Sequence, residues 1–349
     1  MKKPDFKMKK FNFKWFNKWR DKEQKGMSRP STPFRAIVEK ELADYITSWR
    51  IIILLAIIGL TCLGSLYTAM MSIRDAVSSD EANEAFDQAF VFLKLFTVTD
   101  GTLPSFMTFV GFLGPLLGIA LGFDAINSER NKGTLSRMMS QPIPRDFVIN
   151  AKFTAAIILI AALFLALGLV VAGLGLLMIG IPPTFEEFMR LIFFLLVSIV
   201  YVAFWLNLGI LFSVRFRQPA TSALASIAVW LFFSVFYSMI VNLFARAIAP
   251  STTQNVQELL NYQSLILNLS RLSPNYLFNE STATLLTPSV RNLGPLTMDQ
   301  IEGAIASPLP LGQSLLLIWP QLTGLIAATM VCFAISYLYF MRQEIRSRS

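Results

Sequence analysis

Residues 123–147 read FDAINSERNKGTLSRMMSQPIPRDF, a short segment rich in charged residues and interrupted by glycine and proline. The residues on either side, 103–123 and 153–179, contain no Asp, Glu, Lys or Arg. About 20 apolar residues are enough to cross a lipid bilayer as a helix. We therefore predict that the segment is a polar loop between two membrane-spanning helices.

The same kind of apolar run occurs four more times, at residues 51–71, 191–214, 220–244 and 312–341. Hydrophobic residues make up 54% of the chain and charged residues only 15%, whereas a soluble domain carries about 25% charged residues. The sequence therefore predicts an all-α integral membrane protein with six transmembrane helices, of which five lie within residues 51–244 and the sixth at 312–341.

Positive charge is distributed unevenly between the segments that separate these spans. Segments 1–50, 124–152, 215–219 and 342–349 together hold 24 of the 30 Lys and Arg residues. Lys and Arg accumulate on the cytoplasmic side of membrane proteins. We expect a multi-pass protein of the cell membrane with both termini and the 124–152 loop in the cytoplasm, and with segment 245–311 on the outer side.

The cytoplasmic N-terminal region divides into two parts. Residues 1–31 form a basic, aromatic tail, which either lies on anionic lipid headgroups or is a disordered extension; nucleic-acid binding is not favoured, because charge alone is weak evidence. Residues 32–50 place apolar and charged side chains on opposite faces of a helix. Such a helix is typical of the membrane interface.

Two further regions of the chain carry helical patterns. Segment 245–311 contains one pattern over residues 256–272 and a shorter one after residue 297, which predicts an external cap of short helices. Residues 90–98 are apolar but too short to cross a membrane, so they either extend the second span or lie among the headgroups.

Four glycines, Gly111, Gly114, Gly118 and Gly122, lie along the second predicted span. The last three are spaced as GxxxGxxxG, a pattern that lets a second helix approach closely. Helix packing is the favoured interpretation, and a specific hinge in this helix is the alternative.

Several kinds of active site are excluded by residues that the chain lacks. It has no histidine and no GxxxxGK[ST] motif, which removes histidine-based zinc sites and a nucleotide-binding P-loop. Residues 186–190, EEFMR, look like part of the glutamate signature of CAAX-type intramembrane proteases, but the histidines of that family are missing. We interpret 186–190 as a polar loop, and predict no catalytic residues and no metal site.

The loop 124–152 contains a short helical pattern of its own. Gly133 breaks a first turn, Thr134 caps a second, and Pro142 ends it. Leu135, Met138 and Met139 then share one face of this turn. Methionine is common on adaptable binding surfaces, so the turn either docks a soluble partner or folds back on the membrane domain.

The loop resembles the corresponding segment of the permease subunits of ABC-2-type transporters. The residues that match that pattern are Glu129, Arg130, Gly133, Thr134, Leu135, Pro142, Arg145 and Lys152. The sequence VEKEL at residues 38–42 is also similar to the N-terminal helix of that family. The resemblance implies a cytoplasmic coupling helix between the second and third spans.

The resemblance also implies partners. A permease of this family is not an enzyme and has no cofactor; ATP is bound by two copies of a separate P-loop ABC ATPase. A second permease chain, identical or different, and membrane lipids complete the complex, which exports its cargo. Glu129 and Arg130 would brace the loop, and Leu135, Met138 and Met139 would insert into the ATPase, with Arg137 and Arg145 at the rim.

Two other functions remain as alternatives. A membrane enzyme would need an acid, base or nucleophile set that the sequence does not assemble. A non-transporting anchor would use the same fold to transmit the movement of the ATPase to a partner outside the cell, and the large segment 245–311 keeps this alternative open.

Overall fold

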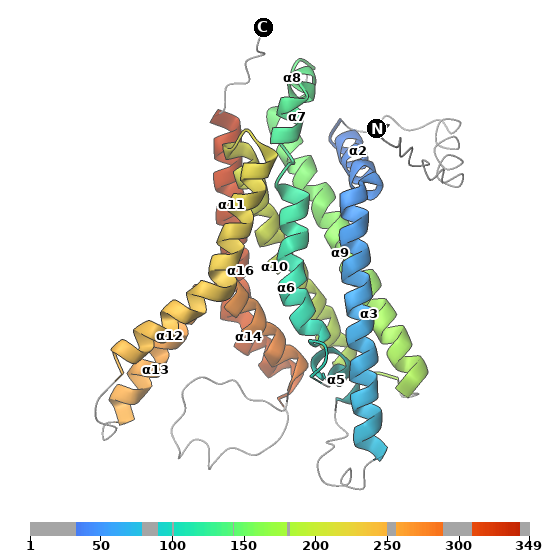
Figure 1. Ribbon diagram of the computed structural model, residues 1–349, viewed down its shortest axis with the longest axis vertical. Coiled ribbons are helices and arrows are strands. Elements are labelled where there is room, and N and C mark those ends of the chain that lie inside the picture. Colours follow the sequence, from blue (N-terminus) through green and yellow to red (C-terminus); the bar gives the residue numbers. More distant parts are fainter. Residues whose placement is uncertain are drawn as a thin grey trace, which may run out of the picture.

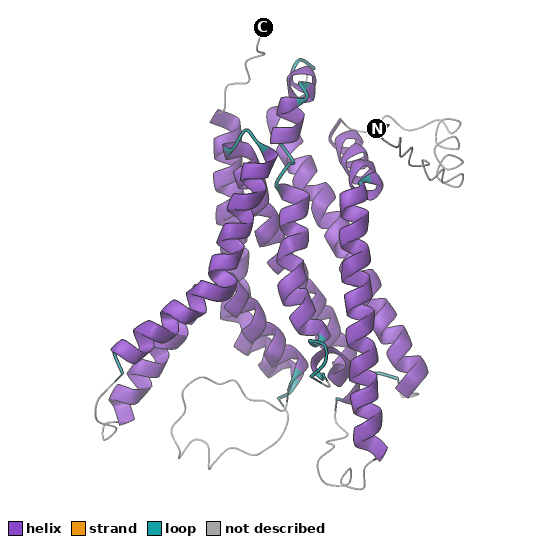
Figure 2. Ribbon diagram, viewed as in Figure 1, coloured by secondary structure: helices purple, strands orange, loops and turns teal. Residues whose placement is uncertain are grey.

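The computed structural model describes residues 33–78, 90–99, 101–141, 143–179, 182–249, 256–288 and 309–342. All regular structure within these ranges is helical (Figure 2), which confirms the predicted fold class. The tail at 1–31 and residues 343–349 lie outside the described ranges, so the predictions made for them stay predictions.

Six helical segments of the described chain are long and apolar enough to cross a membrane, judged by length and composition. They are α3 (Trp49–Ser78), α6 (Phe106–Gly122), α9 (Arg145–Ile179), α10 (Phe185–Arg215), the run of α11 (Pro219–Leu231), η1 (Phe232–Phe236) and α12 (Tyr237–Ala247), and α16 (Leu311–Arg342). The six predicted spans are therefore confirmed as long apolar helices.

Shorter helices lie at both ends of this bundle (Figure 1). The helices α2 (Pro33–Thr47), α7 (Asn127–Asn131) and α8 (Thr134–Met139) lie at the end where α16 finishes. At the opposite end are α5 (Val91–Thr97) and the hairpin of α12 with α13 (Val256–Ser270), which diverges from the bundle. The described parts of the segments that we predict to be cytoplasmic thus share one end.

Helix α10 forms the centre of the bundle. In the apolar stretch of each candidate span, 72% of α10 is buried inside the molecule, compared with 17% of the span from Pro219 to Ala247. Helix α6 lies directly against α10 because the glycines of α6 have no side chain at the contact. A Cβ atom on Gly118 would lie 2.6 Å from the Val202 carbonyl oxygen, and one on Gly122 would lie 2.5 Å from the Leu206 carbonyl oxygen. Gly118 and Gly122 thus let the two helix backbones touch.

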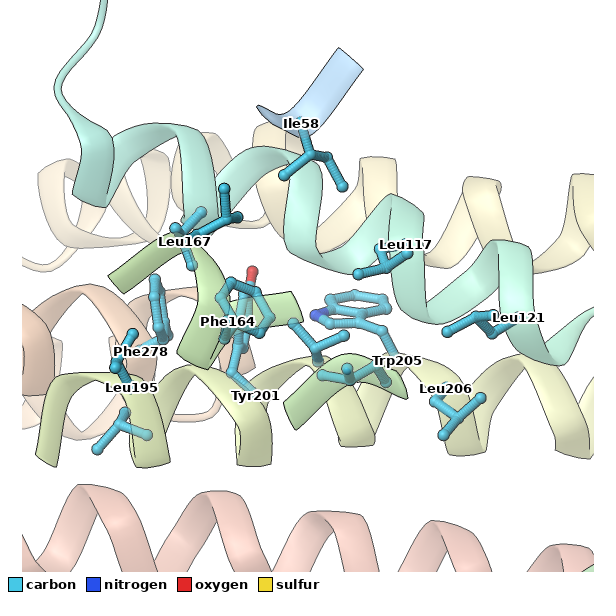
Figure 3. Close-up of a cluster of buried hydrophobic side chains, with 14 of the residues drawn as sticks. Ile58, Leu117, Leu121, Phe164, Leu167, Leu195, Tyr201, Trp205, Leu206 and Phe278 are labelled. Atoms are coloured by element: carbon cyan, nitrogen blue, oxygen red, sulfur yellow. The ribbon is translucent and has the colours of Figure 1, made fainter. Parts of the chain in front are cut away.

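Large side chains fill the space on either side of this contact. Figure 3 shows Leu117 and Leu121 of α6 beside Trp205 and Leu206 of α10, and all four residues are completely shielded from solvent. A Cβ atom on Gly111, the first glycine of the row, would lie 3.4 Å from the Phe278 ring and from Asn279 Oδ1, both on α14. Gly111 therefore faces α14, whereas Gly118 and Gly122 face α10.

Two segments differ from their sequence-based interpretation. Residues 91–97 form the separate helix α5, which does not extend the second span, because Ser105 starts α6 by accepting a hydrogen bond from the Thr108 backbone N–H. Residues 186–190 are not a polar loop. They are the first turns of α10, which begins with a capping box between Thr184 and Glu187.

The segment after the fifth span is partly built into the bundle. The predicted helix over 256–272 is confirmed as α13. The sequence did not predict α14 (Pro274–Leu286), which starts at a proline, as first helical turns often do. Phe278 of α14 is fully buried and stacks on Tyr201 of α10, with ring centroids 4.2 Å apart (Figure 3). The pattern after residue 297 lies outside the described ranges.

Candidate functional site

The loop between α6 and α9 is the candidate site. The chain leaves α6 at Gly122, forms α7, turns at Gly133 with a φ angle of 71°, and then forms α8. This φ is unfavourable for residues with a Cβ atom, which explains the glycine. Thr134 does not cap α8 through its side chain; its hydroxyl donates to the Glu129 carbonyl and joins the two helices. Pro142 lies outside the described residues.

A buried charge network ties this loop to the N-terminal helix. The Lys152 Nζ atom of α9 lies 2.8 Å from Glu41 Oε2 of α2 and 3.0 Å from Glu129 Oε1 of α7. Lys40 Nζ reaches the same two carboxylates, at 3.1 Å from Glu41 and 3.2 Å from Glu129. We call Lys40, Glu41, Glu129 and Lys152 the charge network.

Burial makes this network more than a surface ion pair. The side chains of Lys152, Glu41 and Glu129 are only 3%, 6% and 12% exposed. Burial alone would raise the pKa of Glu41, but the ammonium groups of Lys152 and Lys40 outweigh it and hold that pKa below its ordinary value. Burial opposes the charged form of Lys40 as well, yet Glu41 and Glu129 raise its pKa. Glu41 and Lys40 are therefore both held in their charged forms.

The opposite side of the loop is fastened to the end of α10. Ser213 Oγ accepts hydrogen bonds from the backbone N–H groups of Ile126, at 2.9 Å, and Asn127, at 3.2 Å. Asn131 Nδ2 donates to the Arg217 carbonyl at 3.1 Å. The loop is therefore attached to α2 and α9 through charges and to α10 through hydrogen bonds, so that a displacement of the loop acts on three helices.

A small pocket opens between α2, α3, α6 and α7 beside the charge network. It has a volume of about 140 Å³ and its lining includes Asp44, Arg50, Asp124, Glu129 and Lys132. Arg50 Nη2 pairs with Asp124 Oδ2 across it at 2.6 Å. Acidic and basic groups thus alternate around this pocket and largely neutralise one another.

The predicted docking residues divide into two groups. Leu135 is 1% exposed and packs in the main apolar core, so our expectation that it inserts into a partner is wrong for this conformation. Met139 also packs against that core. Arg137 and Arg145 are exposed and Met138 is half-buried, which leaves a more basic surface than we expected. Arg130 is half-buried and lies outside the charge network.

The structure also adds residues that the sequence did not single out. Glu41 and Lys40 lie within the VEKEL sequence that carried part of the resemblance, so the sequence did contain a signal for these two residues. Ser213 had no such signal, because a serine near the end of an apolar helix is common. The apolar face of α2 packs on α9, with Ile37 and Val38 against Ala151 and Ala155, and its place at a membrane surface stays a prediction.

Comparison with known proteins agrees with this geometry. The family described as ABC-2 family transporter protein matches residues 35–345, which includes α2, the loop and all six long helices. The chain belongs to the ABC-2 family. One curated relative is the probable ABC transporter permease protein NosY of Stutzerimonas stutzeri, which is 27% identical over 149 residues, or 42% of this chain. The match spans 53% of that relative, about half of its length.

Proposed function

We propose that this protein is the permease subunit of an ATP-driven ABC-2 transporter and that it exports its cargo across the cell membrane. The observation that carries the proposal is the attachment of the α7–α8 loop to α2 and to the two membrane-length helices α9 and α10. In this proposal two copies of a P-loop ATPase bind the loops of two permease chains. Closure of the ATPase pair pushes on α7 and α8.

The charge network determines which helices move when the ATPase pushes on α7 and α8. Because Glu129 of α7 shares Lys152 with Glu41 of α2, a shift of α7 by more than an ångström breaks ion pairs that are shielded from water. Breaking a buried pair costs about 3–5 kcal/mol. We therefore expect α2, α7 and the start of α9 to move together when the ATPase acts.

The exposed residues of the loop define the surface that an ATPase would bind. Arg137 projects from α8 into solvent and Met138 lies next to it. A basic residue beside a methionine suits a groove with acidic rims and an apolar floor. Leu135, in contrast, holds α8 against the membrane domain from inside.

The test is co-purification of the tagged chain from its native membrane in a mild detergent, followed by mass spectrometry. We expect a P-loop ATPase to be recovered with the unchanged chain and lost with the double variant Arg137→Glu, Met138→Asp. The control is Arg246→Glu, which reverses the charge of an exposed arginine of α12 at the opposite end as Arg137→Glu does on α8. If the unchanged chain brings down no ATPase, or the double variant retains it, the proposal is wrong.

One observation favours a second function, that of a non-transporting subunit acting on a partner outside the cell. The α12–α13 hairpin diverges from the bundle at the end opposite to α7 and α8 (Figure 1). Such an arm is suited to carry movement to another protein. The same co-purification distinguishes the two functions if an extracytoplasmic protein is recovered and is lost when Leu265 on α13 and Leu272 just after it, both exposed, are replaced by Asp.

A further inference from the structure

The first turns of α10 carry an arginine whose hydrogen-bonding capacity is fully used. Arg190 is completely buried. Its Nε and one Nη2 N–H donate to Glu186 Oε1, at 3.2 and 2.9 Å. Nη1 donates to the Leu285 carbonyl at 3.0 Å and to Ser314 Oγ at 3.1 Å, and Nη2 also donates to the Leu309 carbonyl. All five N–H donors of the guanidinium group therefore have a protein partner.

These partners come from separate parts of the chain. Leu285 lies in the last turn of α14, where backbone carbonyls carry partial negative charge. Ser314 lies in the first turn of α16, and Leu309 precedes that helix. The guanidinium carbon also lies 5.4 Å from the centre of the Phe90 ring, just before α5. Arg190 thus gathers three helices around the start of α10.

Glu187, three residues earlier on α10, joins α5 more directly. Its Oε1 accepts a hydrogen bond from the Phe92 backbone N–H in the first turn of α5, at 3.0 Å. Its Oε2 accepts from the Thr184 backbone N–H at 2.8 Å. We call Glu187 and Arg190 the outer hub, because together they hold α5, α14 and α16 to α10.

The seam at the first turn of α14, the end of that helix away from Leu285, is built differently. There α14 meets the π-helix η1, and the contact depends on a hydrogen bond from Asn275 Nδ2 to Ser234 Oγ at 2.6 Å. Asn275 Oδ1 also lies 2.8 Å from the Tyr201 hydroxyl, which in turn lies 3.0 Å from the Gly111 carbonyl. A tyrosine has one hydroxyl hydrogen to share between these two acceptors. The seam is therefore polar, neutral and incompletely bonded.

The energetic contrast between the two contacts is large. Separating the helices at the outer hub would leave a buried guanidinium without its partners, which is strongly unfavourable. Separating α14 from η1 exchanges neutral hydrogen bonds for bonds to water, which costs little. A π-helix also marks a helix that departs from its regular backbone bonding, commonly at a functional position. Here it lies within the least buried span of the bundle.

We propose that the outer hub keeps α5, α10, α14 and α16 together throughout the cycle, so that the outer end of the permease opens along the seam between η1 and α14. This inference rests on the proposed transport function. Ser234, Asn275 and Tyr201 then line the opening and meet the cargo as it leaves. Arg190 is a positioning residue, because it decides which contact stays closed.

The experiment uses the permease in complex with the ATPase that co-purifies with it, and two disulfide pairs. Ser234→Cys with Asn275→Cys closes the seam. Pro288→Cys with Leu309→Cys is the matched control, because the Leu309 N–H donates to the Pro288 carbonyl at 3.0 Å beside the outer hub. Both pairs are made in a parent chain whose buried Cys62 and Cys332 are replaced by Ala. The effect of each disulfide is measured as the ratio of ATP hydrolysis between the oxidised and the reduced form of the same variant.

We expect oxidation of the seam pair to lower ATP hydrolysis by about an order of magnitude, with recovery on reduction, and oxidation of the control pair to leave hydrolysis unchanged. The inference is overturned if the seam disulfide has no effect or if the control disulfide is equally inhibitory. A parent complex that binds no ATPase contradicts the proposed function instead, and this is known before any crosslink is made.

A second measurement covers the case in which a double variant does not fold. Single variants Asn275→Cys and Leu309→Cys are labelled with a membrane-impermeant maleimide, with and without ATP and vanadate. We expect ATP and vanadate to increase labelling of the cysteine at 275 only. Equal labelling changes at the two positions, or a change at 309 alone, would show that the hub opens and the inference is wrong.

Discussion

Lys152 on α9 joins Glu41 on α2 to Glu129 on α7, with its Nζ atom 2.8 Å and 3.0 Å from the two carboxylates. The three residues are distant in sequence and come from three helices. Together with Lys40, which pairs with the same two carboxylates, this buried ammonium group joins the N-terminal helix to the loop. Two variants, Lys152→Met and Glu41→Gln, test this relationship directly.

Replacement of Lys152 by Met should destabilise the protein strongly, because two carboxylates would then remain buried with only Lys40 as a partner. We expect a loss of about 3–5 kcal/mol, measured as a lower midpoint of unfolding in detergent. The control is Arg35→Met, which removes an exposed pair with Glu39 and should cost no more than about 1 kcal/mol. Equal losses in the two variants would contradict the importance of burial.

The charge network should also make stability depend on pH in a defined direction. The pKa of Glu41 is lower in the folded protein than its ordinary value of about 4.3. The stabilisation that this provides is fully present above the ordinary value and is lost as the pH falls through the lowered pKa. The unfolding midpoints of the unchanged chain and of Glu41→Gln should therefore differ above pH ~4.3 and converge in acid. A constant difference down to strong acid would refute this origin.

Adding a methyl group to Gly118 should separate α6 from α10. A Cβ atom there would lie 2.6 Å from a backbone oxygen and 2.8 Å from a backbone nitrogen, neither of which can move without the helix. We expect Gly118→Ala to cost about 1–3 kcal/mol, as overpacking does. Gly173→Ala is the control, because nothing lies within 4 Å of its Cβ position. The two variants are compared by thermal unfolding in detergent, and similar midpoints would count against a close contact between α6 and α10.

The sidedness of the bundle can be tested with two exposed serines. Ser140 follows α8 and Ser264 lies on α13, at opposite ends of the molecule. In intact cells a membrane-impermeant maleimide should label Ser264→Cys and not Ser140→Cys, and inside-out vesicles should show the reverse. The native cysteines, Cys62 and Cys332, are buried and should contribute little background. The opposite labelling would place α7 and α8 outside the cell.

Most of the membrane-length helices could be predicted from the sequence alone, and the reason is physical. A helix in lipid has to be long and apolar over its whole length, so six runs without interior charge had almost no other structure available. The family match over residues 35–345 agrees with the resemblance carried by residues 129–152. Glycines spaced four residues apart likewise indicated a close helix contact, although this spacing did not predict that α10 would be the partner.

Other features escaped prediction because they depend on neighbours that are distant in sequence. Leu135 has the spacing of a docking residue, but the end of the bundle covers it. Arg190 looked like a residue of a polar loop, although it is the most highly bonded side chain that we find in the described bundle at the end opposite α7 and α8. The sequence of residues 274–286 did not predict that α14 would lie against Tyr201.

The sequence by itself therefore determined the number of spans, their approximate bounds and the polar loop between the second and third, because hydrophobicity and helix length are local properties. Only the tertiary structure decided which charges pair and which side chains of the loop remain exposed. A buried lysine or arginine is stable only where several groups converge on it. That convergence, at Lys152 at one end and Arg190 at the other, is a property of packed helices and not of any single segment.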